Sequence, residues 1–260
     1  MNKHLLLCQT VLPNQGIRVK RQQPLRHLAI IPDGNRRWAK KHGINAEPLI
    51  YEQGSQKTSE ILEAAFSQGV EYVTFWASSY ANLASRPKLL VHAIDAIYAR
   101  KFEELATYPM VFKEKVNIQI IGEWRQLLKP STIQAGQKAI DATAHHHDKF
   151  LTILVGYDGQ RERGQAVQGL LRKGAQPVPT DVLEAEQLLR QHAWTGNLPD
   201  VDLLIRTGAW QDPHNSASFL SFLSGESQFA FPHVLWPDFS ADMLTTLCDD
   251  FSKRERRYGR

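Results

Sequence analysis

The sequence predicts an α/β protein, in which a mostly parallel β-sheet is covered by helices on both faces. Short apolar runs rich in β-branched residues, typical of buried strands, alternate along the chain with longer segments whose apolar residues recur at helical spacing. The 260 residues are 42% hydrophobic and 22% charged, a globular composition that excludes a disordered or collagen-like chain. Ligands of such sheets bind beyond the carboxyl ends of the strands, so the residues that follow each strand are the first candidates for a binding site.

The elements follow one another in a regular order. Strands are predicted at His27–Pro32, Tyr72–Ala77, Val116–Ile121, Phe150–Gly156, Asp200–Ile205 and near Gln228–Phe231. Helices are predicted at Gln53–Gln68, Leu89–Leu105, 131–147, 161–173, 181–192 and Ala241–Arg256. Residues 1–25 show no periodicity and are expected to form a flexible N-terminal arm, while residues 26–260 form one domain.

Charge and cysteine content restrict the compartment and the partners. The net charge of +4 and the pI of about 9.0 indicate phosphorylated ligands or simply a solvated basic face, and no nucleic-acid motif is present. Cys8 and Cys248 are too few and too far apart for a disulfide framework, which favours a reducing compartment. No segment approaches the ~20 apolar residues of a membrane helix, and Leu5–Leu7 is too short for a signal peptide. We therefore expect a cytoplasmic protein.

The first polar cluster, Asp33–Trp38, follows the first predicted strand. Gly34 lets the backbone approach a ligand, and the amides that follow lie at a helix N-terminus, which is a natural phosphate site. Arg36 and Arg37 add fork-shaped donors suited to diphosphate oxygens. Asp33 beside these arginines is consistent with Mg²⁺ bridging the carboxylate to a diphosphate. An Asp-Gly turn that caps a helix is an equally good interpretation of the spacing.

Two further clusters follow strand ends, and each is weaker by itself. Ser78–Asn82, followed by Arg86, could contact a phosphate, but an ordinary polar loop is the favoured interpretation. Arg206–Gly208 could bind an anion or form a structural salt bridge. His145–His147 favours a solvated helix end over a metal site, because consecutive imidazoles on a helix point in different directions.

Four segments, taken together, resemble the cis-prenyltransferases of the undecaprenyl diphosphate synthase family: His27–Lys40, Pro199–Gly208, Val234–Phe239 and Arg254–Gly259. They occur in the family's order and spacing, and the resemblance runs over roughly 27–259. It implies an α/β domain with about six mostly parallel strands, usually a homodimer, and an apolar tunnel for a growing chain. It also implies a Mg²⁺-assisted condensation of an allylic diphosphate with isopentenyl diphosphate, which forms a Z-prenyl diphosphate and releases diphosphate. Only peripheral membrane contact, through a lipid product, is expected.

The resemblance assigns roles residue by residue. The catalytic residues are expected to be Asp33, which also holds Mg²⁺, Asn35 and Asn82. The substrate-binding residues that it implies are Gly34, Arg36, Arg37, Trp38, Ser78, Ser79, Arg86, Arg206, Ser216, Ser218, Arg257 and Gly259. Of these, Arg257 and Gly259 match a terminal Arg-x-Gly that reaches the partner's active site in family dimers.

The chain departs from the family pattern at three places. Tyr51 occupies the position of an expected histidine, and Asn215 falls where an arginine is expected. The loop from Gly208 to Ser218 is longer, so His214, or the hydroxyls of Ser216 and Ser218, can replace the missing donor. The family's metal-binding glutamate appears as Gln228, and Glu226 is the nearest substitute. The sequence thus predicts a preserved allylic site and an altered isopentenyl site.

Two alternatives to ordinary elongation remain open. The first is irregular, lavandulyl-type coupling of two allylic units, or a cyclising synthase, on the same fold. The second is a non-catalytic subunit of a heteromeric cis-prenyltransferase, although such a subunit has little need for Asp33.

Overall fold

The computed structural model describes residues 24–174 and 178–254 and contains one six-stranded sheet. The strands are β1 (His27–Ile31), β2 (Tyr72–Ser79), β3 (Val116–Ile121), β4 (Lys149–Tyr157), β5 (Leu203–Arg206) and β6 (Gln228–Ala230). They lie in the order β3-β4-β2-β1-β5-β6, and every pairing is parallel. The predicted parallel α/β sheet is confirmed.

Strand β1 is central, and all five of its residues are buried. Leu28 lies opposite Val73 of β2 on one side and opposite Leu203 of β5 on the other. The chain leaves β1 toward β2, and β5 later joins its opposite edge. Such a change of direction opens a crevice at the carboxyl ends of the strands, where ligands of α/β proteins bind.

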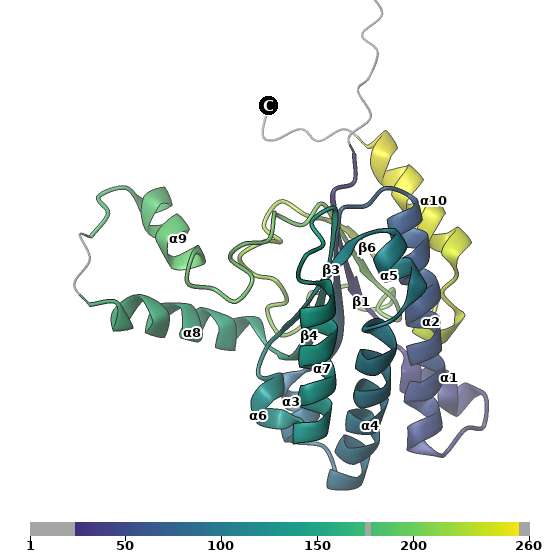
Figure 1. Cartoon of the computed structure of the whole chain (residues 1–260). Helices are drawn as coiled ribbons and strands as arrows, with labels where there is room; N and C mark the ends of the chain where they lie inside the picture. The colour runs from purple at the N-terminus through teal and green to yellow at the C-terminus, as the bar shows by residue number, and fades with distance from the viewer. Residues whose placement is uncertain (1–23, 175–177, 255–260) are drawn as a thin grey trace, which may run out of the picture.

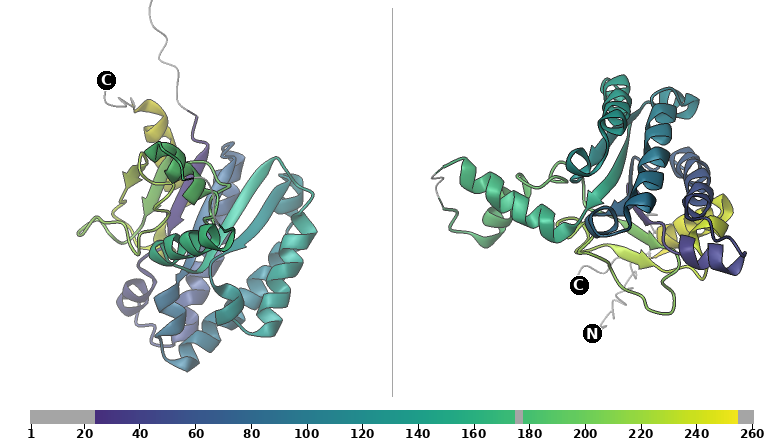
Figure 2. Two further views of the ribbon diagram at one scale, coloured as in Figure 1. Left: turned by 90° about the vertical axis from the view of Figure 1, so that its left-hand side faces the viewer. Right: turned by 90° about the horizontal axis from the view of Figure 1, so that it is seen from below.

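Most helices pack on one face of the sheet, as Figures 1 and 2 show. They are α1 (Asn35–Lys41), α2 (Glu47–Ser67), α3 (Tyr80–Ala84), α4 (Lys88–Leu105), α5 (Pro109–Lys113), α6 (Trp124–Leu127), α7 (Pro130–Thr143), a 3₁₀ turn η1 (Trp236–Asp238) and α10 (Ala241–Lys253). Two helices, α8 (Gly159–Arg172) and α9 (Val182–Arg190), project from the sheet as an arm.

The two faces of the sheet carry different cores. The helical face holds the larger cluster, in which α2, α4 and α7 cover alternate residues of the strands, among them Leu28, Ile30 and Val73. On the opposite face, Ala29, Ile31 and Leu204 pack against irregular segments within 194–201 and 219–223. Because β1 is covered on both faces, its residues from Leu28 to Ile31 form a continuous apolar run rather than an alternating one.

Several boundaries differ from the prediction, and local capping explains most of them. Ser78–Asn82 is not a loop: β2 continues through Ser79, and the Ser79 hydroxyl accepts from the Asn82 amide at 3.1 Å and caps α3. Helix α8 begins before residue 161 because the Asp158 carboxylate caps it. Helix α2 begins at Glu47, with Pro48 in its first turn.

No helix in the described ranges combines the length and the hydropathy that crossing a membrane requires. The division into an arm at 1–25 and a domain at 26–260 stays a prediction, since residues 1–23 lie outside the described part.

Candidate active site

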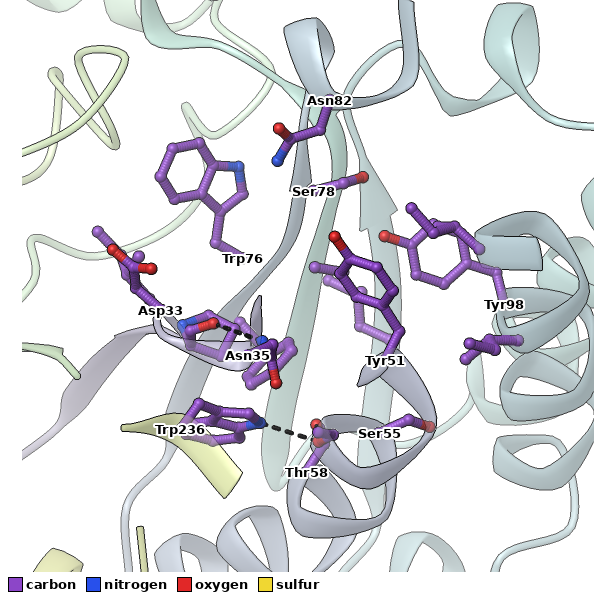
Figure 3. A pocket seen from close by; sticks show the side chains of 18 of the residues that line it. Asp33, Asn35, Tyr51, Ser55, Thr58, Trp76, Ser78, Asn82, Tyr98 and Trp236 are labelled. Atoms are coloured by element: carbon purple, nitrogen blue, oxygen red, sulfur yellow. Dashed lines mark hydrogen bonds between the residues drawn. The ribbon is translucent and has the colours of Figure 1, made fainter. Parts of the chain in front are cut away.

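A cavity of about 760 Å³ opens at the carboxyl ends of β1, β2 and β5 and extends between the sheet and helices α2 and α4. Figure 3 shows the side chains of ten labelled residues around it. Its polar end is formed by the residues that follow β1 and β2, and by Arg206 and Ser216. Its apolar end is lined by Leu62, Phe75, Ile94, Ile97, Phe102, Leu105 and Ile153. A ligand with a charged head and an apolar body would fit this division.

Asp33 lies at the polar end between two arginines. Its Oδ1 accepts from Arg37 Nη2 at 3.1 Å, and its Oδ2 accepts from Arg206 Nη2 at 2.9 Å. The Arg206 side chain is 9% exposed, whereas that of Asp33 is 35% exposed. A charge as deeply buried as that of Arg206 requires partners, and Asp33 is one of them. The structure shows the salt bridge that the sequence left as one alternative at Arg206, and the anion site there stays a prediction.

The backbone holds Asp33 in place from both neighbouring loops. Its carbonyl accepts from Thr207 Oγ1 at 2.7 Å and from the Trp236 amide at 3.1 Å. Gly34 has a φ of 111°, and a Cβ there would lie 2.8 Å from a Leu235 side-chain carbon. Only glycine fits these two conditions, so the Asp-Gly pair is a turn as well as part of the site. Helix α1 begins directly after this turn at Asn35.

Arg37 contacts the cluster after β5, Arg206–Gly208, as well as Asp33. Its Nη1 donates to the Gly208 carbonyl at 2.6 Å, so it joins the residues after β1 to those after β5. Arg36 is exposed and lines the same cavity. The two guanidinium groups thus lie at the cavity mouth, where they can reach an anion.

Four buried polar atoms of the cavity lining have no hydrogen-bond partner among the described residues: Asn35 Oδ1, Ser55 Oγ, Trp76 Nε1 and Arg206 Nε. Buried polar groups normally have partners, so a cluster of unpartnered ones around a cavity indicates a place for a polar ligand or for water. Asn35 is held by its amide, which donates to the Pro32 carbonyl at 3.1 Å. Its Oδ1 faces Gly54, where a Cβ would approach to 2.3 Å.

In the second cluster, Ser78–Asn82 with Arg86, some side chains bond the backbone and others line the cavity. Ser78 is buried, and its hydroxyl accepts from the Gly156 amide at 3.2 Å. Asn82 and Arg86 line the cavity with their side chains. Arg86 Nη1 donates to the hydroxyl of Tyr51 at 2.7 Å.

The aromatic residues of the cavity that were not among the predicted site residues include Tyr51, Trp76 and Tyr98. Burial raises the pKa of Tyr98 well above its usual value, so this phenol stays neutral. A signal for Tyr98 was present, because Ile94 and Phe102 lie four residues to either side and share its helix face. Figure 3 shows the hydroxyls of Tyr51 and Tyr98 directed toward the same part of the cavity, near Ser78.

The long loop after β5 supplies one of its two candidate hydroxyls. Arg206 Nη1 donates to Ser216 Oγ at 2.6 Å and to the His214 carbonyl at 2.9 Å. Ser218 is directed elsewhere, where its hydroxyl accepts from Arg163 at 3.5 Å. Asn215 donates to the Phe219 carbonyl at 3.0 Å and so holds the loop. Of the two serines, Ser216 lines the cavity and Ser218 does not.

Some predicted site residues do not meet in the cavity. The Trp38 indole donates to Asp238 at 2.6 Å and stacks on His42, so it joins α1 to η1 instead of lining the site. Glu226 precedes β6, and the first residue of β6 pairs with the first residue of the parallel strand β5. Glu226 therefore lies at the edge of the sheet where the strands begin. Asp33 lies at the opposite edge, where the strands end. Within one chain Glu226 cannot share a metal with Asp33. Arg257 and Gly259 lie outside the described residues.

Asp33 fits a Mg²⁺ site of the open type. No group of three or more His, Cys, Asp or Glu side chains in the described ranges could hold a metal ion. Mg²⁺ is usually bound by one or two carboxylates together with substrate phosphates and water, so such a group is not needed. Each oxygen of Asp33 accepts from one arginine and keeps further acceptor capacity, and the residue lines the cavity with its side chain 35% exposed.

Comparison with known proteins gives consistent results. The family described as "Putative undecaprenyl diphosphate synthase" matches residues 31–259. The chain is 35% identical over 248 residues to an isoprenyl transferase of Thermus thermophilus, covering 93% of this chain and 91% of that protein. It is 33% identical over 245 residues to a tritrans,polycis-undecaprenyl-diphosphate synthase (geranylgeranyl-diphosphate specific) of Pyrococcus abyssi. This match covers 90% of this chain and 87% of that protein.

A solved structure shares the fold. The lavandulyl diphosphate synthase of Lavandula x intermedia, in complex with dimethylallyl diphosphate, superposes with a TM-score of 0.78 at 24% identity and covers 90% of this chain and 98% of that one. Together with the family match over residues 31–259, these identities show that the chain belongs to the undecaprenyl diphosphate synthase family and is a prenyl transferase of the cis type.

Proposed function

We propose that the protein condenses an allylic diphosphate with isopentenyl diphosphate to give a Z-prenyl diphosphate. The observation that carries the proposal is the position of Asp33, held between Arg37 and Arg206 at the polar end of a cavity whose other end is apolar. A prenyl diphosphate has the same division into a charged head and an apolar chain.

The residues around Asp33 bind and orient the allylic diphosphate. Arg36 and Arg37 offer guanidinium donors at the cavity mouth, and charge-assisted bonds to phosphate oxygens are the strongest that side chains make. Such donors also stabilise the negative charge that develops on the departing diphosphate. Asn35 and Asn82 both line the cavity and offer amide groups to the substrate. Mg²⁺, held by Asp33 and the substrate phosphates, would supply further positive charge for the departure.

Arg206 and Ser216 serve the second substrate. Their bond of 2.6 Å fixes the guanidinium, and the unpartnered Nε remains available. No second arginine comes from the loop, because Asn215 takes the expected position and bonds Phe219 instead. A lost charge-assisted hydrogen bond weakens binding by roughly tenfold to a hundredfold, so we expect a weak site for isopentenyl diphosphate. Calorimetric titration with Mg²⁺ and an unreactive allylic analogue measures it, and low-micromolar affinity would contradict the altered-site interpretation.

The active form is proposed to be a homodimer. Large apolar side chains are exposed along the arm formed by α8 and α9, among them Leu171 at 72%, Val182 at 80% and Leu183 at 71%. Their exposure is an argument for a covering partner, and a second copy is the partner that we propose. Sedimentation at micromolar concentration tests it. Removing residues 256–260 should impair use of the second substrate more than it impairs dimer formation. The cytoplasmic location stays a prediction.

One experiment tests the reaction itself. Purified protein is incubated with Mg²⁺ and pairs of diphosphates from C5 to C20, and the products are identified by mass spectrometry and by their double-bond geometry. Products longer by whole C5 units with new Z bonds support the proposal. Branched or cyclic products from two allylic diphosphates would replace it with irregular coupling. Turnover in no pair would leave a non-catalytic subunit.

A further inference from the structure

We infer that Arg161 is a positioning residue, which stacks on Tyr80 and so holds helix α3, with Asn82, at the edge of the cavity. The inference rests on the proposed function, because Asn82 is one of the residues expected to be catalytic. Arg161 lies in the first turn of α8 and does not line the cavity. Its influence on the reaction therefore passes through the helix that it supports.

Three neighbouring strand ends meet at Arg161. Strands β3, β4 and β2 are adjacent and parallel, so their carboxyl ends share one edge of the sheet. Glu123 follows β3, Arg161 follows β4 and Tyr80 follows β2. One side chain thus joins the connections that leave three strands.

The guanidinium of Arg161 is held in one orientation by Glu123. Its Nε donates to Oε1 at 2.8 Å and its Nη2 donates to Oε2 at 2.7 Å, an arrangement of two bonds that fixes the planar fork. The carboxylate is itself placed by a tight turn. Gly122 has a φ of 117°, and a Cβ there would lie 2.3 Å from the Val155 carbonyl oxygen. The Glu123 amide donates to the Gly156 carbonyl at 3.3 Å.

The fixed guanidinium lies over the ring of Tyr80. The Arg161 Cζ is 3.7 Å from the centroid of this ring. At such a distance a guanidinium both attracts the π-system and packs against it. Tyr80 is the first residue of α3, so the contact acts where this helix leaves β2.

Helix α3 depends on contacts of this kind. It has five residues, too few for a helix that is stable by itself, and Leu83 is the buried one. The Ser79 hydroxyl caps it by accepting from the Asn82 backbone amide at 3.1 Å. The side chain of Asn82 lines the cavity, next to Ser78 in Figure 3. A shift of α3 therefore displaces the side-chain amide that the reaction is expected to use.

Exposure separates this role from a purely structural one. The side chains of Arg161 and Glu123 are 42% and 20% exposed, and ion pairs at such positions contribute little to folding stability. Removal of the pair should leave the chain folded. A displaced group in an active site, by contrast, costs a large part of the rate.

The chain offers a matched control at the opposite edge of the sheet. Arg26 Nε donates to Glu71 Oε2 at 2.9 Å, and the Arg26 Cζ lies 5.3 Å from the centroid of the Tyr72 ring. Tyr72 begins β2, whereas Tyr80 follows the end of the same strand. The two arginines have the same kinds of partner, but Arg161 is the one at the edge where the cavity opens.

The first test measures the order of α3 by hydrogen–deuterium exchange of a peptide that spans 78–86. Arg161→Met keeps the aliphatic stem and removes the guanidinium, so the amides of α3 should exchange at least about fivefold faster than in wild type. Arg26→Met should leave exchange in this peptide unchanged. Both variants should melt within a few degrees of wild type.

The second test is a double-mutant cycle on steady-state rates. Arg161→Met should lower kcat about tenfold and change KM for either substrate less than about threefold, because the ligand-binding groups of the cavity remain. In a Tyr80→Leu background the same change should lower kcat about twofold or less, since the guanidinium then has no ring to hold. Arg26→Met should keep wild-type rates.

Three results would overturn the inference: unchanged exchange of α3 in Arg161→Met, faster exchange with unchanged kcat, or an equal loss of kcat in both Tyr80 backgrounds. The exchange experiment needs no turnover. If wild type forms no prenyl product while the exchange result holds, the proposed reaction fails and the support of α3 by Arg161 stands.

Discussion

The cavity has two arginine-bearing sides that are built differently. On the side of β5, Arg206 is buried and bonds the carboxylate of Asp33, the hydroxyl of Ser216 and a backbone carbonyl. On the side of α2, Arg86 is partly exposed and bonds the phenol of Tyr51. Burial explains the difference, because a guanidinium removed from water needs a compensating charge, whereas a half-exposed one does not.

This difference separates two tasks. The Arg206 side is a preformed ion-pair network in which Arg37 and Arg206 share the one carboxylate of Asp33. A ligand anion that enters this side must compete with the Asp33 carboxylate for hydrogen bonds from Arg37 and Arg206. The Arg86 side keeps an unmatched positive charge and so contributes attraction rather than geometry. Substitutions on one side are expected to leave the contacts of the other side intact.

The largest effect is expected for Asp33→Ala. Loss of the carboxylate that would hold a catalytic metal should remove several kcal/mol of transition-state stabilisation, or about a thousandfold in kcat. The chain should still fold, with a lower melting temperature, because Arg206 loses the charge of Asp33 and retains the neutral Ser216 hydroxyl and His214 carbonyl. Single-turnover rates and thermal unfolding measure the two properties. A variant that unfolds, or one with near-native rates, would refute the assignment of Asp33.

The next effect is expected for Arg206→Lys, which keeps the charge and removes the fork. A lysine cannot bond Asp33 and Ser216 at once with the same planar geometry. We expect kcat/KM for the second substrate to fall roughly tenfold to a hundredfold. Arg86→Lys should cost less, because a point charge retains most of an unmatched attraction. Equal losses of kcat/KM in Arg206→Lys and Arg86→Lys would contradict the difference between the two arginine-bearing sides.

A smaller effect is expected for Ser216→Ala. The change removes the hydroxyl that accepts from Arg206 at 2.6 Å, and the His214 carbonyl still holds the same nitrogen. KM for the second substrate should rise about threefold to tenfold, with KM for the allylic substrate unchanged. Ser218→Ala is the matched control, because Ser218 does not line the cavity.

The smallest effect on activity is expected from His27, which lies away from both sides at the start of β1. It is buried, bonds Thr74 and the Pro199 carbonyl, and burial lowers its pKa to about 4. A lowered histidine pKa means that the unfolded chain binds more protons, so stability falls as the pH drops from 6.5 toward 4, by about 3 kcal/mol in total. Denaturant unfolding at several pH values should show a smaller pH dependence in His27→Gln. Equal slopes in both proteins would exclude this contribution.

The alternation of apolar strands and amphipathic helices was enough to predict the sheet. Strand β1 is apolar from Leu28 to Ile31 because both of its faces are buried, and that pattern is visible in the sequence. The strand ends at Asp33 and Arg206 were recognised for the same reason, since a polar residue directly after a buried run must lie at a sheet edge. The Ser78–Asn82 segment was misjudged, because its residues favour both a turn and a helix cap, and the pairing of β2 with β4 decides between them.

What the sequence by itself determined is therefore the class of fold, the family and the residues that follow the strands, because these depend on short-range patterns. Tertiary structure alone decided which of those residues meet. Ser216 reaches Arg206 while Ser218 turns away, Trp38 joins η1, and Glu226 lies at the opposite edge. The pairing of Tyr51 with Arg86, 35 positions apart, depends on how α2 packs beside α4. Contacts of this kind are set by the packing of whole elements, which no local pattern encodes.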